Sequence, residues 1–504
     1  MADETEDVWA FDPLDDIVPF GKHRGKSIRE LPTDYVSWLL SKATFDWVDA
    51  NRDTLERALT HVDESAVPDY TLADDQREAA DDIEACLVLG EANAHRLQGG
   101  AGYGKSFACI DVVLRAKRAG FIVRACATSY VATQNLAKDL EPLGVECATI
   151  ARTLQLDVIH RGMKDLYVPG DRTYGELAVL LQEGSMLIVD EYSMVDDTIG
   201  TLLLDAAARH GGKLLVVGDV YQLPSPAQDW DSNLCKVEPS CELVLPKRYA
   251  ADSDLFKIER EVRQDPYQFD PDRYASSPEV GTVSTLDGLV DAYVRSYQDN
   301  PDDQHLMVWY RRADMAASNR QIRRALFSDG VAEIAPGEQL RVQRTADFTP
   351  YYGADGDRVY SGTTFAVREA HVGDQTITID EAGLSFHIPC YWVDTDDLRR
   401  FAVLFSITEN QAESGTRGAD EFNAALRELA QWCDANNSWK PYRDFRNCFV
   451  QVAYQYASTV HRVQGQSVDR VFTCPNALRM ADPYTSTKLQ YVALTRAKKK
   501  LTCL

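Results

Sequence analysis

The residues Gly99-Gly100-Ala101-Gly102-Tyr103-Gly104-Lys105-Ser106 fit the pattern Gly-x-x-x-x-Gly-Lys-[Ser/Thr]. A short strand is predicted before this stretch, at His95–Leu97, and a helix after it, at Phe107–Ala119, which Gly120 ends. The glycines let the backbone curl so that several N–H groups point at phosphate oxygens. The N-terminal end of the helix adds positive potential. We expect Lys105 to reach the β- and γ-phosphates of a nucleotide and the Ser106 hydroxyl to bind Mg²⁺.

Two carboxylates follow a second apolar strand, Met186-Leu187-Ile188-Val189-Asp190-Glu191. At the tip of a strand beside a phosphate loop, one carboxylate can hold Mg²⁺ and another can polarise the attacking water. We assign the metal to Asp190 and the water to Glu191. A further strand, Leu214–Val217, is followed by Gln222, whose amide is placed to sense the γ-phosphate.

These strands are short, apolar and separated by helical segments, and Ile122–Ala127 is another of the same kind. Such a pattern is typical of buried parallel sheets built from repeated strand–helix–strand units. The predicted fold class is therefore α/β. The stretch from about 336 to 445 interrupts the alternation of strands and helices, because it contains several glycines and short strands such as Thr364–Val367 and Thr376–Ile379. We interpret it as an inserted small β-barrel, followed by a helical stretch at Ala419–Ala435.

The bulk composition is that of a globular protein without a membrane span. Among 504 residues 45% are hydrophobic, and the net charge is −25. An acidic N-terminus, Met1–Asp7, argues against a signal peptide. The 11 cysteines include no Cys-x-x-Cys pair, so reduced thiols and an intracellular, cytoplasmic location are expected. Because an acidic surface repels phosphate, any nucleic acid would have to be bound through local basic patches.

The order and spacing of these motifs resemble superfamily 1 helicases of the 5′→3′ branch, closest to the phage Dda and RecD-like helicases, over about residues 71–504. The resemblance implies two RecA-like motor domains, ATP and Mg²⁺ as cofactors, and single-stranded and forked DNA as partners of a monomeric motor. It predicts a domain at 67–245 with a pin insertion at about 155–184, and a second domain at 246–504 with the barrel insertion at about 336–450.

The resemblance also assigns roles to individual residues. Gln76 matches the glutamine that reads the adenine, and Arg248 matches an arginine finger supplied by the second motor domain. Arg496, in the last motif, is expected to reach the γ-phosphate. The motif Ser458–Gly465 matches the one that joins the DNA contact to the nucleotide cleft. The residues that it implies for DNA contact are Thr128, Thr149, Thr459 and His461, and Gly465 is assigned to the nucleotide site.

Several positions depart from the family pattern. Ala151-Arg152 stands where His-Ser is usual, and Tyr103 replaces a threonine. In the pin segment, Leu166-Tyr167-Val168-Pro169-Gly170-Asp171 is interpreted as strand and turn, with Tyr167 as the aromatic that stacks on a base at the fork. The alternative for Tyr167 is simple packing.

Residues 1–66 are predicted to form a small N-terminal α+β module. It resembles the small Phe-Gly-Lys-x-x-Gly-Lys domain that follows some DnaQ-type exonucleases. Its basic turn is an ordinary surface turn, a DNA phosphate contact or a docking point for a replication or repair protein. These three interpretations stay open. The residues of the turn are Lys22, His23, Arg24 and Lys26.

Two further questions stay open at this stage. Arg320, Arg323 and Arg324 share one face of a predicted helix, where phosphate contact and surface salt bridging are equally compatible with the spacing. The leading function is an ATP-dependent DNA helicase. The alternative is a nucleic-acid-stimulated ATPase that acts as a remodeller or RNA helicase without unwinding DNA.

Overall fold

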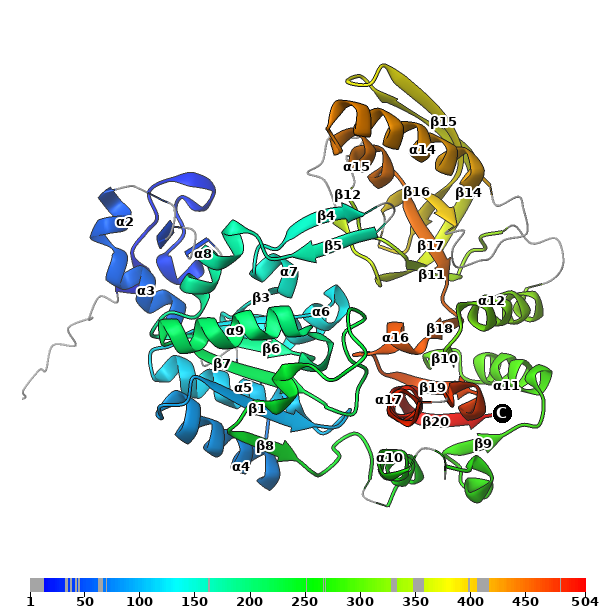
Figure 1. The fold of residues 1–504 in the computed structure, drawn as a ribbon, viewed down its shortest axis with the longest axis horizontal. Coiled ribbons are helices and arrows are strands. Elements are labelled where there is room, and N and C mark those ends of the chain that lie inside the picture. Colours follow the sequence, from blue (N-terminus) through cyan, green and yellow to red (C-terminus); the bar gives the residue numbers. More distant parts are fainter. Residues whose placement is uncertain are drawn as a thin grey trace, which may run out of the picture. The chain divides into compact units, whose positions relative to one another are not determined.

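The computed structural model describes residues 13–504 apart from 32–34, 37–38, 41–42, 44–45, 62–66, 69, 162–163, 251, 266, 268, 328–332, 348–357, 398, 406–416 and 481. The chain divides into two compact units (Figure 1). Unit 1 comprises Met1–Val220 and Pro224–Arg248, and unit 2 comprises Tyr221–Leu223 and Tyr249–Leu504.

Unit 1 is built on a six-stranded parallel sheet with the order β3-β2-β6-β7-β1-β8. Its central strands are almost wholly buried, as their apolar sequences predict. The bounds are β1 Ala94–Gly99, β2 Ile122–Ala127, β3 Glu146–Thr149, β6 Ser185–Asp190, β7 Lys213–Gly218 and β8 Ser240–Leu243.

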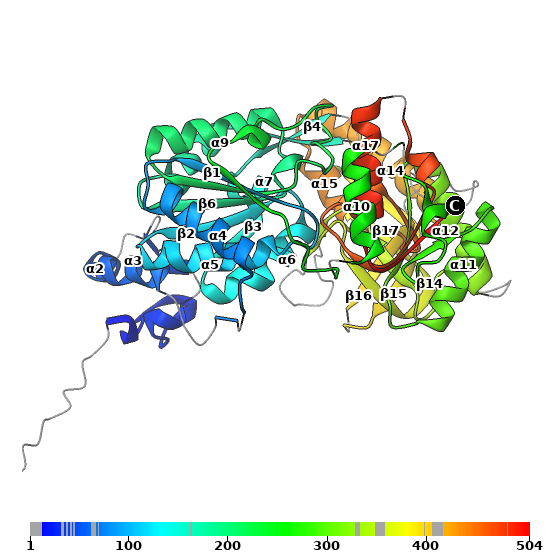
Figure 2. The same cartoon turned by 90° about the horizontal axis from the view of Figure 1, so that it is seen from below.

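Helices cover both faces of this sheet, which explains why its strands are apolar on both sides. In Figure 2, α9 lies on one face and α4 and α5 lie on the other. Helix α8 packs beside α9, and α6 packs beside α5. The bounds are α4 Asp74–Ile83, α5 Lys105–Arg118, α6 Tyr130–Leu140, α7 Ile150–Thr153, α8 Asp171–Leu180 and α9 Asp197–His210.

The N-terminal module of unit 1 has its own small apolar core, which includes Leu14, Ile28 and Leu55. Its described elements are η1 Pro13–Asp15, η2 Gly21–His23, η3 Ile28–Glu30, α2 Asp46–Ala50 and α3 Arg52–Thr60. Strand pairing within its described residues is limited to one bridge, Ile17 with Ser27. The predicted α+β module is therefore mainly helical over the residues that can be described.

Unit 2 contains a second parallel sheet, of five strands in the order β18-β10-β19-β20-β9. The strands are β9 Val280–Thr282, β10 His305–Trp309, β18 Ala457–Thr459, β19 Val468–Thr473 and β20 Ala497–Cys503. The helices of this part are α10 Asp254–Gln264, α11 Leu286–Asp299, α12 Arg312–Leu326, α16 Val460–Val463 and α17 Pro483–Leu494.

The predicted insertion is a closed five-stranded barrel with two helices beside it. Its elements are β11 Gln339–Val342, β14 Thr364–Ile379, β15 Leu384–Thr395, β16 Arg400–Phe405, β17 Val450–Tyr454, α14 Ala419–Asn436 and α15 Lys440–Asn447. A separate two-stranded ribbon joins β12 Ala346–Asp347 to β13 Arg358–Val359.

The two short strands predicted at Thr364–Val367 and Thr376–Ile379 are wrong, because both belong to the single strand β14. Gly373, which suggested a break, lies inside that strand. A Cβ there would come within 2.6 Å of Trp392 Cδ1 on the neighbouring strand β15. The glycine therefore makes room for a large cross-strand side chain and does not form a turn.

The structure also settles the surroundings of two basic clusters. Lys498–Lys500 lie on β20, and Lys499 pairs with Asp303 and Asp469. Arg323 on α12 forms a buried ion pair with Glu338, with Nε to Oε1 at 2.8 Å. Of the two interpretations left open for Arg323, the structure favours the ion pair.

None of the helices in the described part of the chain is long and apolar enough to cross a bilayer.

Candidate nucleotide and nucleic-acid site

The predicted nucleotide-binding residues of unit 1 meet at one edge of its sheet. In a parallel sheet the carboxyl ends of all strands lie at the same edge, where ligands bind. The register pairs Gln98 of β1 with Gly218 of β7, and Asp190 of β6 with Val217 of β7 and Ala127 of β2. The phosphate loop, the paired acids and the end of β2 are therefore neighbours in space, as the sequence predicts.

The phosphate loop runs from the end of β1 into α5, and Ser106 lies exposed in the first turn of that helix. Lys105 Nζ donates to the carbonyl oxygens of Gly99 at 2.8 Å and Gly100 at 3.1 Å. Gly102 and Gly104 have φ values of +82° and +83°, in the left-handed region that favours glycine. The loop therefore curls around its own lysine, in the conformation that presents backbone N–H groups to an anion.

Gln76, on the first turn of α4, holds the loop from outside. Its Nε2 donates to the carbonyl oxygens of Gly104 at 3.1 Å and Tyr103 at 3.3 Å, while its Oε1 accepts from the backbone N–H of Ala73. The side chain is 2% exposed. Its role in reading adenine stays a prediction, and the contacts seen here add a role in positioning the loop.

The two acids differ in their surroundings. Burial raises the pKa of Asp190, and the positive charge of Lys105 opposes that rise. Glu191 has φ +54°, an uncommon conformation for a residue with a side chain. A hydroxyl at the start of a helix and a carboxylate at a strand tip are oxygen donors that suit Mg²⁺. Ser106 and Asp190 would hold the ion, which would neutralise phosphate charge.

A buried polar network behind the acids was missed by the sequence reasoning. Gln98, the residue before the phosphate loop, accepts through Oε1 from the hydroxyl of Tyr192 and from the backbone N–H of Val220 at 3.1 Å. Its Nε2 donates to Asp219 Oδ1 at 3.2 Å. One side chain thus ties together the strand ends that carry the phosphate loop, the acids and the Gln222 segment. The position of the polar residue Gln98 in the buried strand β1 was the sequence feature that could have indicated this network.

The predicted origin of Arg248 in the second motor domain needs correction. The division between the units falls after Arg248 and not after Leu245. The backbone N–H groups of Lys247 and Arg248 donate to the carbonyl oxygen of Gly102 at 2.8 and 3.0 Å. A Cβ on Gly102 would lie 2.5 Å from Arg248 Cβ. Backbone pairing with the loop therefore holds Arg248 in unit 1, beside the phosphate loop itself.

Gln222 follows β7 of unit 1 in the sequence but belongs to unit 2, because residues Tyr221–Leu223 group with that unit. Lys488 Nζ donates to the carbonyl oxygen of Gln222 at 2.9 Å, and Gln464 Nε2 donates to that of Leu223 at 3.2 Å. The guanidinium of Arg263 lies 4.7 Å from the ring centre of Tyr221. The predicted phosphate sensor is thus covalently joined to unit 1 and held by side chains of unit 2.

Arg496 is 2% exposed and lies in unit 2 at the end of α17. It donates through Nε to the carbonyl oxygen of Val492 at 3.0 Å and through Nη1 to that of Gln466 at 3.0 Å. Gly465, beside Gln466, has φ +73°. The structure therefore brings Arg496 next to the Gly465 turn, and its reach to a γ-phosphate stays a proposal.

The predicted DNA contacts fall in two pairs, one in each unit. In unit 1, Thr149 ends β3 opposite Ala127, and Thr128 follows Ala127, so the two threonines are close. Thr149 caps α7 by accepting from the N–H of Arg152 at 3.4 Å. In unit 2, Thr459 and His461 lie at the junction of β18 and α16. Each pair stands at the carboxyl edge of its own sheet.

The predicted pin exists as a hairpin of β4 Asp157–Arg161 and β5 Lys164–Val168, but its turn is not where the sequence placed it. Pro169-Gly170 leads from β5 into α8, and the true tip lies between Arg161 and Lys164, outside the described residues. Tyr167 pairs with Val158 near the base of the hairpin and is 58% exposed. The predicted turn at Pro169-Gly170 is therefore wrong, because these residues lead into α8, whereas the stacking of Tyr167 on a base at the fork stays a prediction.

In the N-terminal module, two of the four basic residues of the turn pack against one aromatic ring. Lys22 Nζ lies 5.6 Å from the ring centre of Tyr35, and the His23 ring centre lies 4.5 Å from it. These contacts fit an ordinary packed turn and leave the other two interpretations open.

Comparison with known proteins matches two parts of the chain to family models. Residues 71–231 match the AAA domain, and residues 454–503 match the UvrD-like helicase C-terminal domain. No curated protein is significantly similar to the sequence.

Among solved structures, the Pif1 helicase from Candida albicans aligns with a TM-score of 0.47 at 15% identity, over 86% of this chain and 94% of that one. The Bacteroides Pif1 helicase in complex with ADP-AlF3 and single-stranded DNA aligns with a TM-score of 0.45 at 14% identity, over 86% and 92%.

The AAA match spans the phosphate loop and the paired acids of unit 1, and the UvrD-like match spans the Gly465 turn and Arg496 of unit 2. The AAA match thus falls in unit 1 and the UvrD-like helicase C-terminal match in unit 2, and each unit contains a parallel sheet, in agreement with the predicted α/β fold of two domains.

Proposed function

We propose that this protein is an ATP-dependent DNA helicase that translocates 5′→3′ on single-stranded DNA and unwinds duplexes. The observation that carries the proposal is the complete nucleotide site of unit 1, with Lys105 in the loop and Asp190 and Glu191 at the adjoining strand tip. It stands in one chain with a second RecA-like domain that matches a helicase family. The direction of travel rests on the resemblance of the motifs to the 5′→3′ branch.

Each residue of the site has a definite task in hydrolysis. Lys105, released from the loop carbonyls, binds the β- and γ-phosphates, and Glu191 accepts a proton from the attacking water. Ser106 and Asp190 would hold Mg²⁺, which would supply positive charge to neutralise the phosphates. Arg248 and Arg496 donate to the transferring phosphoryl group, whose negative charge they stabilise.

Coupling to movement follows from the path of the chain. Residues Tyr221–Leu223 leave unit 1 immediately after Val220, which Gln98 holds beside the phosphate loop, and they are bonded to unit 2 by Lys488 and Gln464. A change at the γ-phosphate is thereby transmitted to the second motor domain. Closing and reopening of the two domains moves the threonine pair of unit 1 relative to Thr459 and His461, which is what translocation requires.

The partners follow from the same proposal. Single-stranded and forked DNA are the substrates, and the N-terminal module is a docking point for replication or repair proteins. The cytoplasm is the proposed location, in accord with the 11 cysteines, none of which forms a disulfide among the residues described.

The test is unwinding of duplexes that carry either a 5′ or a 3′ single-stranded tail, with Mg²⁺ and ATP, beside Lys105→Ala. Opening of the 5′-tailed duplex alone, lost in Lys105→Ala, is the expected result. Opening of the 3′-tailed duplex would overturn the direction. ATPase activity that DNA stimulates without any unwinding would favour the remodeller, and stimulation by RNA alone would favour an RNA helicase.

A further inference from the structure

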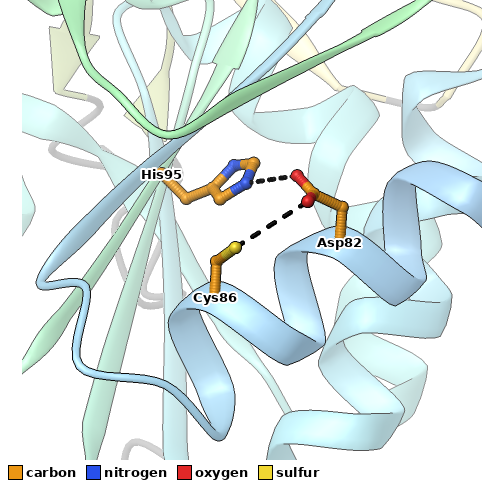
Figure 3. Close-up of side chains that lie close together, drawn as sticks. All are labelled: Asp82, Cys86 and His95. Carbon is orange, nitrogen blue, oxygen red and sulfur yellow. Dashed lines mark hydrogen bonds and ion pairs between the residues drawn. The ribbon is translucent and has the colours of Figure 1, made fainter.

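Three side chains of different chemistry converge in unit 1, away from the phosphate loop. Figure 3 shows Asp82, Cys86 and His95 with their donor atoms facing one another. His95 Nε2 lies 2.9 Å from Asp82 Oδ2, and Cys86 Sγ lies 3.7 Å from Asp82 Oδ1. One ligand atom from each of the three lies within 4.8 Å of those of the other two.

The local fold explains why these residues meet. Asp82 and Cys86 are four residues apart, which places both on one face where α4 continues into the π-helical turn η4 Glu84–Val88. Single π-turns are often found at functional sites. His95, the second residue of β1, is fully buried and projects from the sheet toward that helical face. Asp82 is 45% exposed, so the cluster is open to solvent on one side.

A second cysteine lies beside the cluster. Cys241 on β8 pairs in register with Leu97 of β1, and side chains two apart on a strand share a face, so Cys241 and His95 project to the same side. Its thiol contacts the carbonyl oxygen of Ala79, one turn before Asp82 on α4. Burial raises the pKa of the Cys241 thiol to about 12, and the nearby charge of Asp82 adds to the rise.

We propose that Asp82, Cys86 and His95 form a binding site for a zinc-class divalent ion. The thiol of Cys241 lies outside this 4.8 Å group and would have to move toward it to serve as the fourth ligand. Imidazole, thiolate and carboxylate are the ligands that Zn²⁺ takes in proteins, in a tetrahedron with bonds of roughly 2.0 to 2.3 Å. Tetrahedral bonds of that length put ligand atoms roughly 3.3 to 3.8 Å apart. The contact of Cys86 Sγ with Asp82 Oδ1, 3.7 Å, falls within that range, whereas the contact of His95 Nε2 with Asp82 Oδ2, 2.9 Å, is shorter and would have to lengthen around an ion.

Binding is balanced by proton release. Each cysteine thiol loses its proton to solvent as its sulfur bonds to the metal, and His95 binds through Nε2 with its remaining proton on Nδ1. The Nε2 contact to Asp82 is thereby replaced by two metal bonds. No oxidant or reductant is required, because Zn²⁺ has no redox chemistry.

The site has a structural role and not a catalytic one. His95 lies at the start of β1, whereas the phosphate loop follows its end, about 15 Å away at roughly 3.3 Å per residue. The ion would fasten α4, which carries Gln76, to strands β1 and β8. A ligand that binds only the folded state stabilises it, so zinc is expected to raise the melting temperature of the protein.

The experiment uses the full chain, stripped with a chelator and then titrated with Zn²⁺. Metal content after gel filtration, and the thiolate absorption of bound Co²⁺, report the site directly. The expected result is one Zn²⁺ per chain, and a fall in affinity of at least about tenfold in Cys86→Ser. Cys241→Ser is expected to keep the site with weaker thiolate absorption.

Matched controls separate this site from other ligands in the chain. Cys147→Ser removes a thiol from the same sheet, and His371→Ala removes the histidine of another Glu–His–Asp group, whose Asp394 is already held by Arg400 at 2.6 Å. Both are expected to bind Zn²⁺ like the parent. Equal binding by the parent and Cys86→Ser, or no bound zinc in the parent, would overturn the proposal and leave a simple His95–Asp82 hydrogen bond. Lys105→Ala, which abolishes hydrolysis, should still bind zinc, so this test and that of the helicase fail independently.

Discussion

Replacing Glu338 by glutamine tests the ion pair that this buried carboxylate forms with Arg323 in unit 2. Glu338 is 1% exposed, and its carboxylate accepts four hydrogen bonds: from Arg323 Nε at 2.8 Å and Nη2 at 3.4 Å, from the hydroxyl of Tyr456 at 2.9 Å, and from the backbone N–H of Ala335 at 3.0 Å. Glutamine keeps one accepting oxygen and turns an N–H₂ group toward donors. The variant therefore removes the negative charge that Glu338 places beside the partly buried guanidinium of Arg323.

The magnitude follows from that burial. Breaking one side of a buried pair costs about 3–5 kcal/mol. A domain of this size loses about 2–4 °C per kcal/mol, so the melting temperature of unit 2 is expected to fall by roughly 6–20 °C. Differential scanning calorimetry measures this directly, since the two units can melt separately.

A matched control uses the pair Arg273–Glu261, whose N–O distance is 3.1 Å and whose side chains are 49% and 32% exposed. Because exposed pairs contribute about 1 kcal/mol at most, Glu261→Gln should shift the transition by no more than about 4 °C. If Glu338→Gln melted within that same margin, the reasoning from burial would be refuted. If DNA binding by Arg323→Met depended less on salt concentration than DNA binding by the parent, Arg323 would contact a DNA phosphate. That result would favour the other interpretation that the sequence left open.

Three further predictions concern the nucleotide site and the response to pH. Gly104→Ala places a Cβ 2.1 Å from Gln76 Nε2 at φ +83°, so kcat/KM for ATP should fall at least about tenfold. The control is Gly120→Ala, which has φ +89° and no atom within 4 Å of the added Cβ, and which should lower stability alone. Equal losses of ATPase activity in the two variants would contradict the argument. Tyr192→Phe removes the hydroxyl that donates to Gln98, a loss of about 1 kcal/mol, and should lower kcat roughly fivefold with KM almost unchanged; unaltered ATPase would show that the network does not position the loop. Burial lowers the pKa of His305, so its unfolded form binds protons more readily, and stability should be full above pH ~6.5 and decline as the pH falls below it. Melting at pH 7.5 and 5.5 should therefore differ less in His305→Gln than in the parent, and an equal difference would count against this group.

Local sequence was sufficient to predict the strands and the helix that carry the proposed nucleotide site. A phosphate loop depends on glycines at fixed spacing and on the strand and helix that flank it, so the bounds of β1 and α5 were predicted to within a few residues. Short apolar runs likewise predicted β2, β6 and β7, because a strand covered on both faces has to be apolar throughout. The inserted barrel was predicted because the alternation of strands and helices stops there, although β14 was not recognised as one strand.

Tertiary structure alone decided which groups meet across long stretches of chain. Arg248 lies with the phosphate loop of unit 1 because its backbone pairs with Gly102, and the Gln222 segment belongs to unit 2 because Lys488 and Gln464 bind its carbonyls. Motif order carries no information about either partner. The same holds for the proposed zinc site, where Cys86 and Cys241 are 155 residues apart and only the pairing of β1 with β8 brings them near each other. Periodicity and motifs report the local backbone and the burial of each segment, whereas the partners of a buried polar group are fixed only when the sheet is assembled.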